Sequence, residues 1–235
     1  MEKNKTGKYF KYAIGEIVLV VIGILIALSI NNWNENNKLD TKKQSYYQQL
    51  LEDLKKDKEF SENTIAKFRT QRKTYEDYRQ EFYKTKLSPQ DVNKNLFDLH
   101  MEAYGIFFNS STIETLQNSG EIALIPAVLR NKLIDLKRFQ ERISQGSQNS
   151  NRSKNNVTES IFILLGQLDL EERIEKQGEL KTFLNIEENR KEIILGMESI
   201  QGWKNHSETT TIRELEELLK DITIIEELIQ KEIKD

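Results

Sequence analysis

The chain contains no cysteine and little proline or glycine, with 2 Pro and 10 Gly in 235 residues. The absence of cysteine excludes a disulfide framework, thiolate metal ligands and a cysteine nucleophile. Proline and glycine are common in the turns of sandwiches and barrels, so their scarcity argues against those folds. Because 31% of the residues are charged and only 37% are hydrophobic, the composition predicts an all-α protein built from long charged helices.

Histidine is scarce too, and neither positive nor negative charge predominates. His100 and His206 are the only histidines, which leaves little material for a histidine-pair metal site or a Ser-His-Asp triad. Neither a GxGxxG nor a GxxxxGK[ST] loop occurs to cradle a nucleotide. The 35 basic and 38 acidic residues are scattered, without the basic stripe that neutralises phosphates. We therefore expect no enzyme, no cofactor, no metal site and no nucleic-acid partner.

What the sequence does contain is one long apolar run, YAIGEIVLVVIGILIALSINNWNE, from Tyr12 to Glu35. Glu16 is its only charged residue before Ile30. About 19 helical residues span about 28 Å, close to the ~30 Å hydrocarbon core of a bilayer. The run therefore predicts a single membrane span. The expected organisation is a basic tail (1–11), a transmembrane helix (12–33), a juxtamembrane segment (34–42) and one large domain (43–235).

The residues that flank the span predict its orientation. Lys3, Lys5, Lys8 and Lys11 precede it, and by the positive-inside rule they favour a cytoplasmic N-terminus. The large domain would then be periplasmic, on a bacterial inner membrane. Three aromatic residues stand where interfacial anchors form: Tyr9, Tyr12 and Trp33. The alternative is a cleaved signal peptide, because Ala27-Leu28-Ser29 loosely fits a cleavage site, but the apolar run is longer than a typical h-region.

Glu16 inside the span has two interpretations. It lies about one turn from the cytoplasmic end, where its carboxylate can reach the headgroups or Lys8 and Lys11 at little cost. It also shares one helix face with Gly23 and Ala27, a small-xxx-small pair of the kind that mediates helix association. The second interpretation predicts a homo-oligomer with a titratable group inside it.

Three long amphipathic segments of similar length follow, at about 43–86, 126–170 and 186–233. Their apolar residues recur three and four apart, most clearly in the last segment at Leu215, Leu218, Ile222, Ile225 and Ile229. Similar lengths predict an elongated antiparallel helical bundle. The polar run 144–156 lies inside the second segment, but the heptad phase is the same on both sides, which predicts one continuous helix.

Short helices between the long segments are expected to cap the bundle. Ser88 with Pro89 and Asp91 predicts a helix through about Tyr104, and Ser111 with Glu114 indicates a capping box for a second one. Gly120 is expected to end that second helix, and Pro126 to open the next long one.

Each long segment is polar near its middle, and in an antiparallel bundle these middles meet at one level. The hypothesis is a polar waist that holds a small ligand, lined by Ser147, Ser150, Lys154, His206 and Thr209. The simpler interpretation is that these residues lie on solvated helix faces.

The N-terminal run resembles the hallmark of a family of uncharacterised single-span membrane proteins from Gram-negative bacteria. The stretch STIETLQNSGEIALIPAVLRNKLIDL, Ser111 to Leu136, is similar to a second motif of that family. One departure is Ser29, where the family pattern has Gln. The resemblance implies a location in the cell envelope and assigns no reaction.

The function expected from the sequence is therefore non-enzymatic. We expect an inner-membrane-anchored periplasmic protein that contacts the lipid bilayer, forms a homo-oligomer and acts as a scaffold or partner for other envelope proteins. The alternatives are an extracytoplasmic ligand-sensing bundle that uses the polar waist, and an oligomeric pore or ion-linked component built around Glu16.

Overall fold

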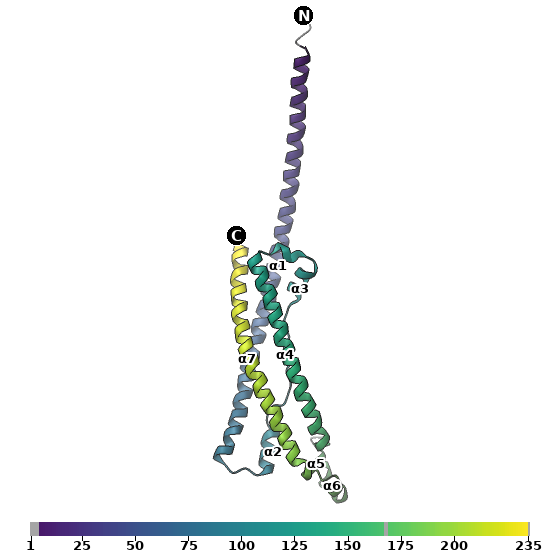
Figure 1. Cartoon of the computed structure of the whole chain (residues 1–235), viewed down its shortest axis with the longest axis vertical. Helices are drawn as coiled ribbons and strands as arrows, with labels where there is room; N and C mark the ends of the chain where they lie inside the picture. The colour runs from purple at the N-terminus through teal and green to yellow at the C-terminus, as the bar shows by residue number, and fades with distance from the viewer. Residues whose placement is uncertain (1–4, 167–168, 235) are drawn as a thin grey trace.

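The computed structural model describes residues 5–166 and 169–234, and within these ranges all regular structure is helical, as predicted (Figure 1). Residues 1–4 of the predicted basic tail lie outside it. The three long helices are α1 (Lys5–Lys84), α4 (Ala127–Leu165) and α7 (Arg190–Lys234). The shorter elements are α2 (Pro89–Phe97), α3 (Ser111–Asn118), η1 (Glu121–Leu124), α5 (Leu170–Ile174), α6 (Gly178–Leu184) and η2 (Ile186–Asn189).

Helix α1 is continuous from the apolar run into the bundle. The sequence has neither glycine nor proline between Gly23 and Pro89, so no strong helix breaker interrupts it. Every residue from Ile14 to Ile30 is exposed, and this helix is long and apolar enough to cross a membrane. Figure 1 shows its N-terminal part projecting beyond the other helices. The predicted juxtamembrane segment 34–42 is thus part of the same helix.

Helix α7 packs against both α1 and α4 and runs antiparallel to α1 (Figure 1). Polar contacts between them show the direction, because the partner's number in α7 falls as the number in α1 rises. The Tyr47 hydroxyl donates to Glu232, Arg69 donates to Glu216, and the Tyr78 hydroxyl donates to Glu198. The apolar line predicted for α7 is completely buried at its centre: Leu215, Leu218, Ile222, Ile225 and Ile229 are all 0% exposed.

The apolar core is divided into two clusters. The larger cluster lies at the end nearer the apolar run and joins residues such as Leu50 of α1, Leu133 of α4 and Ile222 of α7. The smaller one lies at the other end, where Leu96 of α2 and Met197 of α7 are buried. Polar residues are buried between the two clusters.

The second long helix is continuous through the polar run 144–156, as the heptad phase predicted. It ends at Leu165 rather than near 170, because Gly166 adopts a positive φ of 73° that an α-helix does not contain. Periodicity therefore predicted the three long helices and their apolar seams, but it did not predict the C-terminal end of α4.

The short helices differ from expectation in two places. Ser88 and Asp91 form the predicted capping box of α2, but the helix ends at Phe97, and residues 98–110, here called the connecting segment, are not helical. His100 therefore lies in an irregular segment, not in a helix.

The capping box predicted at Ser111 and Glu114 does not form. The N-cap of α3 is Ser110, which makes no side-chain cap hydrogen bond. The side chain of Asp53 on α1 supplies the missing acceptor at this helix start. It accepts hydrogen bonds from the Thr112 backbone N at 3.3 Å and from Thr112 Oγ1 at 2.7 Å. A carboxylate from another helix satisfies this helix start, which local sequence cannot reveal. Gly120 does follow α3 in the left-handed region at φ 75°, as expected.

Two glycines of α7 should respond oppositely to alanine. Gly202 is exposed, and a methyl group added there would have open space around it, so Gly202→Ala should raise stability by about 0.5 to 1 kcal/mol through helix propensity. A methyl at Gly196 would lie 2.9 Å from Ile161 Cγ1 of α4, so Gly196→Ala should be less stable than Gly202→Ala by about 1 to 3 kcal/mol. Thermal unfolding of the detergent-solubilised variants measures this. Equal gains would show that α4 and α7 do not approach closely there.

Candidate functional site

The candidate site is a group of buried polar residues midway along the bundle. Gln71 of α1, Lys154 of α4 and three residues of α7, Gln201, Lys204 and Glu208, are each 8% exposed or less. We call these five residues the waist. The polar stretches of α4 and α7 thus lie in the same part of the bundle, and α1 contributes Gln71 there.

A separate buried carboxylate, that of Asp57 on α1, accepts hydrogen bonds from two other parts of the chain. Its Oδ1 accepts from the Asn109 backbone N at 2.7 Å and from Asn109 Nδ2 at 2.9 Å. Its Oδ2 accepts from Gln140 Nε2 of α4 at 2.6 Å. Burial raises the pKa of Asp57, and these hydrogen bonds oppose that rise. Asp57 thereby fastens the connecting segment to both α1 and α4.

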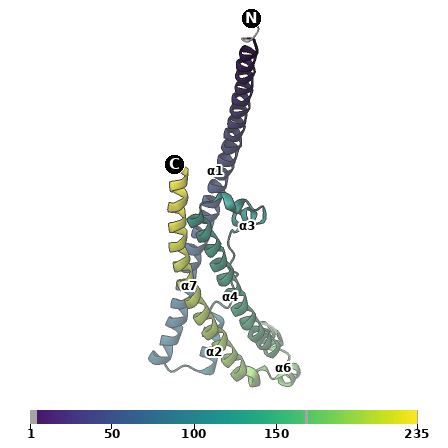
Figure 2. The same cartoon turned by 45° about the horizontal axis from the view of Figure 1, so that its top comes forward.

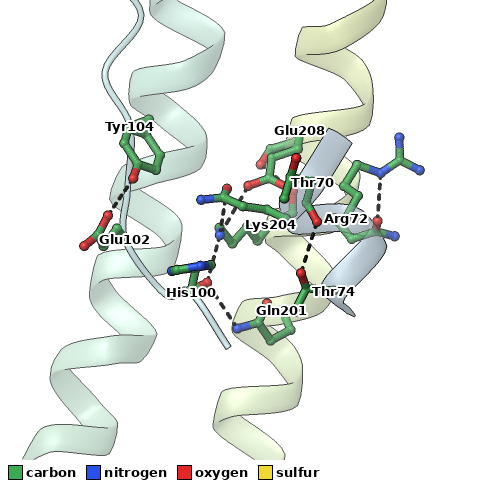
Figure 3. A network of polar contacts seen from close by, with 12 residues as sticks. Thr70, Arg72, Thr74, His100, Glu102, Tyr104, Gln201, Lys204 and Glu208 are labelled. Atoms are coloured by element: carbon green, nitrogen blue, oxygen red, sulfur yellow. Dashed lines mark hydrogen bonds and ion pairs between the residues drawn. The ribbon is translucent and has the colours of Figure 1, made fainter. Parts of the chain in front are cut away.

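Within the waist, Lys204 is the best-partnered charge (Figure 3). Its Nζ donates to Gln71 Oε1 at 3.1 Å and to the backbone carbonyl of His100 at 2.8 Å. It also lies 3.3 Å from Glu208 Oε1, one helical turn away. Burial lowers the pKa of Lys204 and raises the pKa of Glu208, while their mutual attraction opposes both shifts. The pair therefore joins α1, α7 and the connecting segment.

Lys154 lies across from this pair on α4 and has no such partner. It is 5% exposed, and within residues 5–166 and 169–234 its Nζ makes neither a hydrogen bond nor an ion pair. Burial lowers the pKa of Lys154, and the nearby charge of Lys204 lowers it further, against the opposing effect of Glu208. The waist thus contains two ammonium groups for one carboxylate.

Two small cavities flank Glu208, each about 10 Å³, which is room for about one water-sized sphere. One lies between α4, α7 and the connecting segment, where its lining includes Ser150, Lys154 and Thr211. The other lies between α1 and α7 and includes Gln71 and Lys204. Chemically, these walls can hold one small polar species by hydrogen bonds and charge.

The residues predicted to line the waist separate into two groups. Ser147, Ser150 and Lys154 all line the first cavity. His206 and Thr209 are exposed on α7 and line neither cavity, so the structure does not bring them to the waist. At 100° per residue, His206 points about 200° away from the inward-facing Lys204, and Thr209 lies one residue beyond Glu208.

Sequence reasoning missed Gln71, Lys204 and Glu208, although helical spacing gives a signal for each of them. Lys204, Glu208 and Thr211 continue the three-and-four spacing of the α7 seam backwards from Leu215. Following that register into the polar stretch would have placed both charges on the buried face. Gln71 lies three residues after Phe68 and four before Tyr75, so following the register of α1 would have placed it on the buried face too.

The residues proposed for membrane contact lie on the free part of α1. Glu16, Gly23, Ala27 and Trp33 are all exposed, and a methyl placed on Gly23 would have open space around it. The side chains of Tyr9 and Tyr12 lie outside the described part of the chain. The face that Glu16 shares with Gly23 and Ala27 is thus uncovered by the described residues of this chain.

The fold and the site together define an all-helical protein with one N-terminal helix long and apolar enough to cross a membrane. The chain belongs to a family of unknown function (DUF6090), which matches residues 16–186. That match begins inside the apolar run and includes all of α4, but it ends before α7. No curated protein and no solved structure matches the chain.

Replacing the unpartnered Lys154 by an apolar side chain should stabilise the bundle. Lys154→Met removes a buried charge and keeps a long unbranched side chain, so we expect a gain of about 1 to 4 kcal/mol at neutral pH. Because folding lowers the pKa of Lys154, the native chain binds fewer protons than the unfolded one in the alkaline window below the usual lysine pKa. Wild-type stability therefore rises through that window, and the advantage of Lys154→Met shrinks.

Thermal unfolding at low ionic strength from pH 7 to about pH 10 measures the difference. Arg152→Met is the matched control, because Arg152 is exposed on the same helix and its replacement keeps Lys154, so the stability difference between this variant and wild type should not change with pH. A loss of stability in Lys154→Met at pH 7, or the same pH profile in both variants, would contradict the expectation.

Proposed function

We propose that the protein is a non-enzymatic, membrane-anchored helical scaffold. The observation that carries the proposal is the continuity of α1, whose exposed apolar run passes without a break into the buried core of the bundle. An exposed run of this length is costly in water and is stabilised in a bilayer. The same helix is then both the anchor and a structural member of the bundle.

A polar stem separates the anchor from the bundle. Residues 31–42 of α1 are helical and exposed, which corresponds to about 18 Å of helix between the apolar run and the first bundle contacts. At the base of the bundle, Glu121 accepts hydrogen bonds from Lys42 and from the Tyr46 hydroxyl of α1. These contacts tie η1 to the end of the stem. The bundle would therefore be held at a set distance from the membrane surface.

The proposed location is a bacterial inner membrane, with the N-terminus in the cytoplasm and the bundle in the periplasm. The lysines before the apolar run support this orientation. Association of copies through the face of Glu16, Gly23 and Ala27 would make the anchor an oligomerisation element. Scaffolding is favoured over sensing of an organic ligand, because each waist cavity has room for about one water-sized sphere.

Single cysteines test the orientation cleanly, because the chain has none of its own. In intact cells with a permeabilised outer membrane, a membrane-impermeant maleimide should label Arg152→Cys in the bundle. Lys5→Cys should be labelled only after the inner membrane is disrupted. Both variants should remain in the membrane fraction after alkaline carbonate extraction. A soluble Arg152→Cys product shortened at its N-terminus would instead indicate a cleaved signal peptide, and the reverse labelling pattern would overturn the orientation.

Oxidative crosslinking tests association through the span. Ala27→Cys lies on the proposed face, whereas Leu25→Cys lies about 200° around the helix and is the matched control. In native membranes Ala27→Cys should form a disulfide-linked dimer in at least several-fold higher yield than Leu25→Cys. Adding Glu16→Ala to Ala27→Cys reports whether the carboxylate contributes. Equal or negligible yields at both positions would exclude this face as a contact.

A further inference from the structure

The short helix α6 has an apolar face that the described part of the chain leaves uncovered. Leu180, Phe183 and Leu184 lie within about 100° of one another around this helix. Phe183 is 84% exposed, and α6 has no buried residue. We call these three residues the α6 face. An exposed apolar face of this kind is typical of a surface that binds another protein.

A second exposed apolar surface lies where α1 ends. Tyr83, the next-to-last residue of α1, is 80% exposed, and the neighbouring Phe82 is 46% exposed. We call Phe82 and Tyr83 the aromatic corner. Aromatic side chains are enriched where two protein surfaces meet, so this corner is suited to contact another chain.

The two surfaces lie at the same end of the bundle, the end farther from the apolar run. Figure 1 and Figure 2 both show the end of α1 and helix α6 on opposite sides of that end. Within one chain, therefore, the aromatic corner and the α6 face do not cover each other.

The charge beside the aromatic corner is positive. Lys84 and Lys86 follow it, are exposed, and form no ion pair within the described part of the chain. Of the carboxylates nearest in the sequence, Glu81 is half-buried and Asp91 is held in the capping box of α2. The aromatic corner is therefore bordered by two free ammonium groups.

The charge beside the α6 face is more often negative than positive. Glu179 lies on the same side of α6 as Phe183, about 40° away around the helix, and Glu172 lies on the preceding helix α5. Both carboxylates are exposed and form no ion pair with the described residues, whereas Lys181 is paired with Glu175 at 2.6 Å. The α6 face and the aromatic corner thus carry complementary charge.

A shallow hollow beside the α6 face offers a place for a side chain of another molecule. Its lining includes Lys176, Glu179, Leu180 and Phe183. Tyrosine suits this lining, because its ring can pack on the apolar side chains while its hydroxyl donates to the Glu179 carboxylate. The same chain carries such a tyrosine at the same end of the bundle, which favours a second copy as the occupant over a different protein.

We propose that the aromatic corner of one copy docks on the α6 face of a neighbouring copy of this chain. Tyr83 enters the hollow beside Phe183, and Lys84 and Lys86 lie opposite Glu172 and Glu179. The inference rests on the proposed membrane anchor, because anchored copies stand parallel and hold this end of the bundle at the same height above the bilayer. Two different surfaces that meet in this way form a heterologous contact, which generates a ring when the rotation closes.

Crosslinking between two differently tagged copies tests the contact in native membranes, because the chain has no cysteine of its own. One copy carries Gln80→Cys, one turn before Tyr83, and a co-expressed copy carries Gln177→Cys at the hollow, so every proposed contact residue is kept. Oxidation should link the two tags in several-fold higher yield than when the second copy carries Lys181→Cys. Lys181 is the matched control, because it is exposed about 200° from Phe183 around α6.

Equal yields from Gln177→Cys and Lys181→Cys would overturn the proposal. A higher yield between two copies of Gln177→Cys than between Gln80→Cys and Gln177→Cys would also overturn it, because α6 would then pack on α6.

Charge reversal in separate copies tests the pairing of the two surfaces. Lys84→Glu with Lys86→Glu in the first copy should lower the yield several-fold, and so should Glu172→Lys with Glu179→Lys in the second copy. Both sets together should restore the yield to within about twofold of the unreversed pair, because each altered charge again faces an opposite one. Structural damage cannot produce this rescue, so a yield that stays low with both sets would contradict the contact.

Carbonate extraction of the same membranes measures the anchor separately. A protein that stays in the membrane fraction without the excess crosslink would overturn this contact and leave the proposed scaffold standing. A protein released by carbonate would overturn the anchor, and with it the parallel alignment on which the contact depends.

Discussion

The structure depends on the apolar seam of α7. This helix packs extensively against both α1 and α4, and its central seam residues are fully buried. Each buried Leu or Ile side chain contributes roughly 1.5 to 3 kcal/mol relative to exposure, so one continuous stripe supplies a large part of the core. Neither α1 nor α4 could bury its own apolar face without this shared partner. The antiparallel path of α7 also places the C-terminal end beside the base of the stem (Figure 2).

The waist is the place where that seam becomes polar without leaving the interior. Continuing the three-and-four spacing backwards from Leu215 leads to Thr211, Glu208 and Lys204, which are buried like the apolar residues that follow them. Burying charge in this way stabilises a bundle little, and well-packed apolar residues often do better. The arrangement does specify one alignment of α1 against α7, because only one register of these two helices brings Gln71 within hydrogen-bond distance of Lys204.

Periodicity predicted most of the fold and only part of the site. The three long helices, the continuity of α4 through 144–156 and the capping box at Ser88 follow from local spacing. The helix starts and ends that were wrong depend on distant groups or on backbone conformation, as with Asp53 at the start of α3 and Gly166 after α4. At the waist, Ser147, Ser150 and Lys154 were found because they interrupt a strong pattern. His206 and Thr209 were misplaced because composition was used there instead of helical phase.

The unbroken path of α1 also sets an angular relation between two surfaces that are far apart. At about 100° per residue, the buried face of α1 at Tyr47, Leu50 and Leu54 lies on roughly the opposite side of the helix from the face at Glu16, Gly23 and Ala27. In an assembly joined through the latter face, the α1 helices would line the symmetry axis, with α4 and α7 at the periphery. Residue count along the stem therefore determines which surfaces of the bundle are presented outward, and inserting a single residue there would rotate them by about 100°.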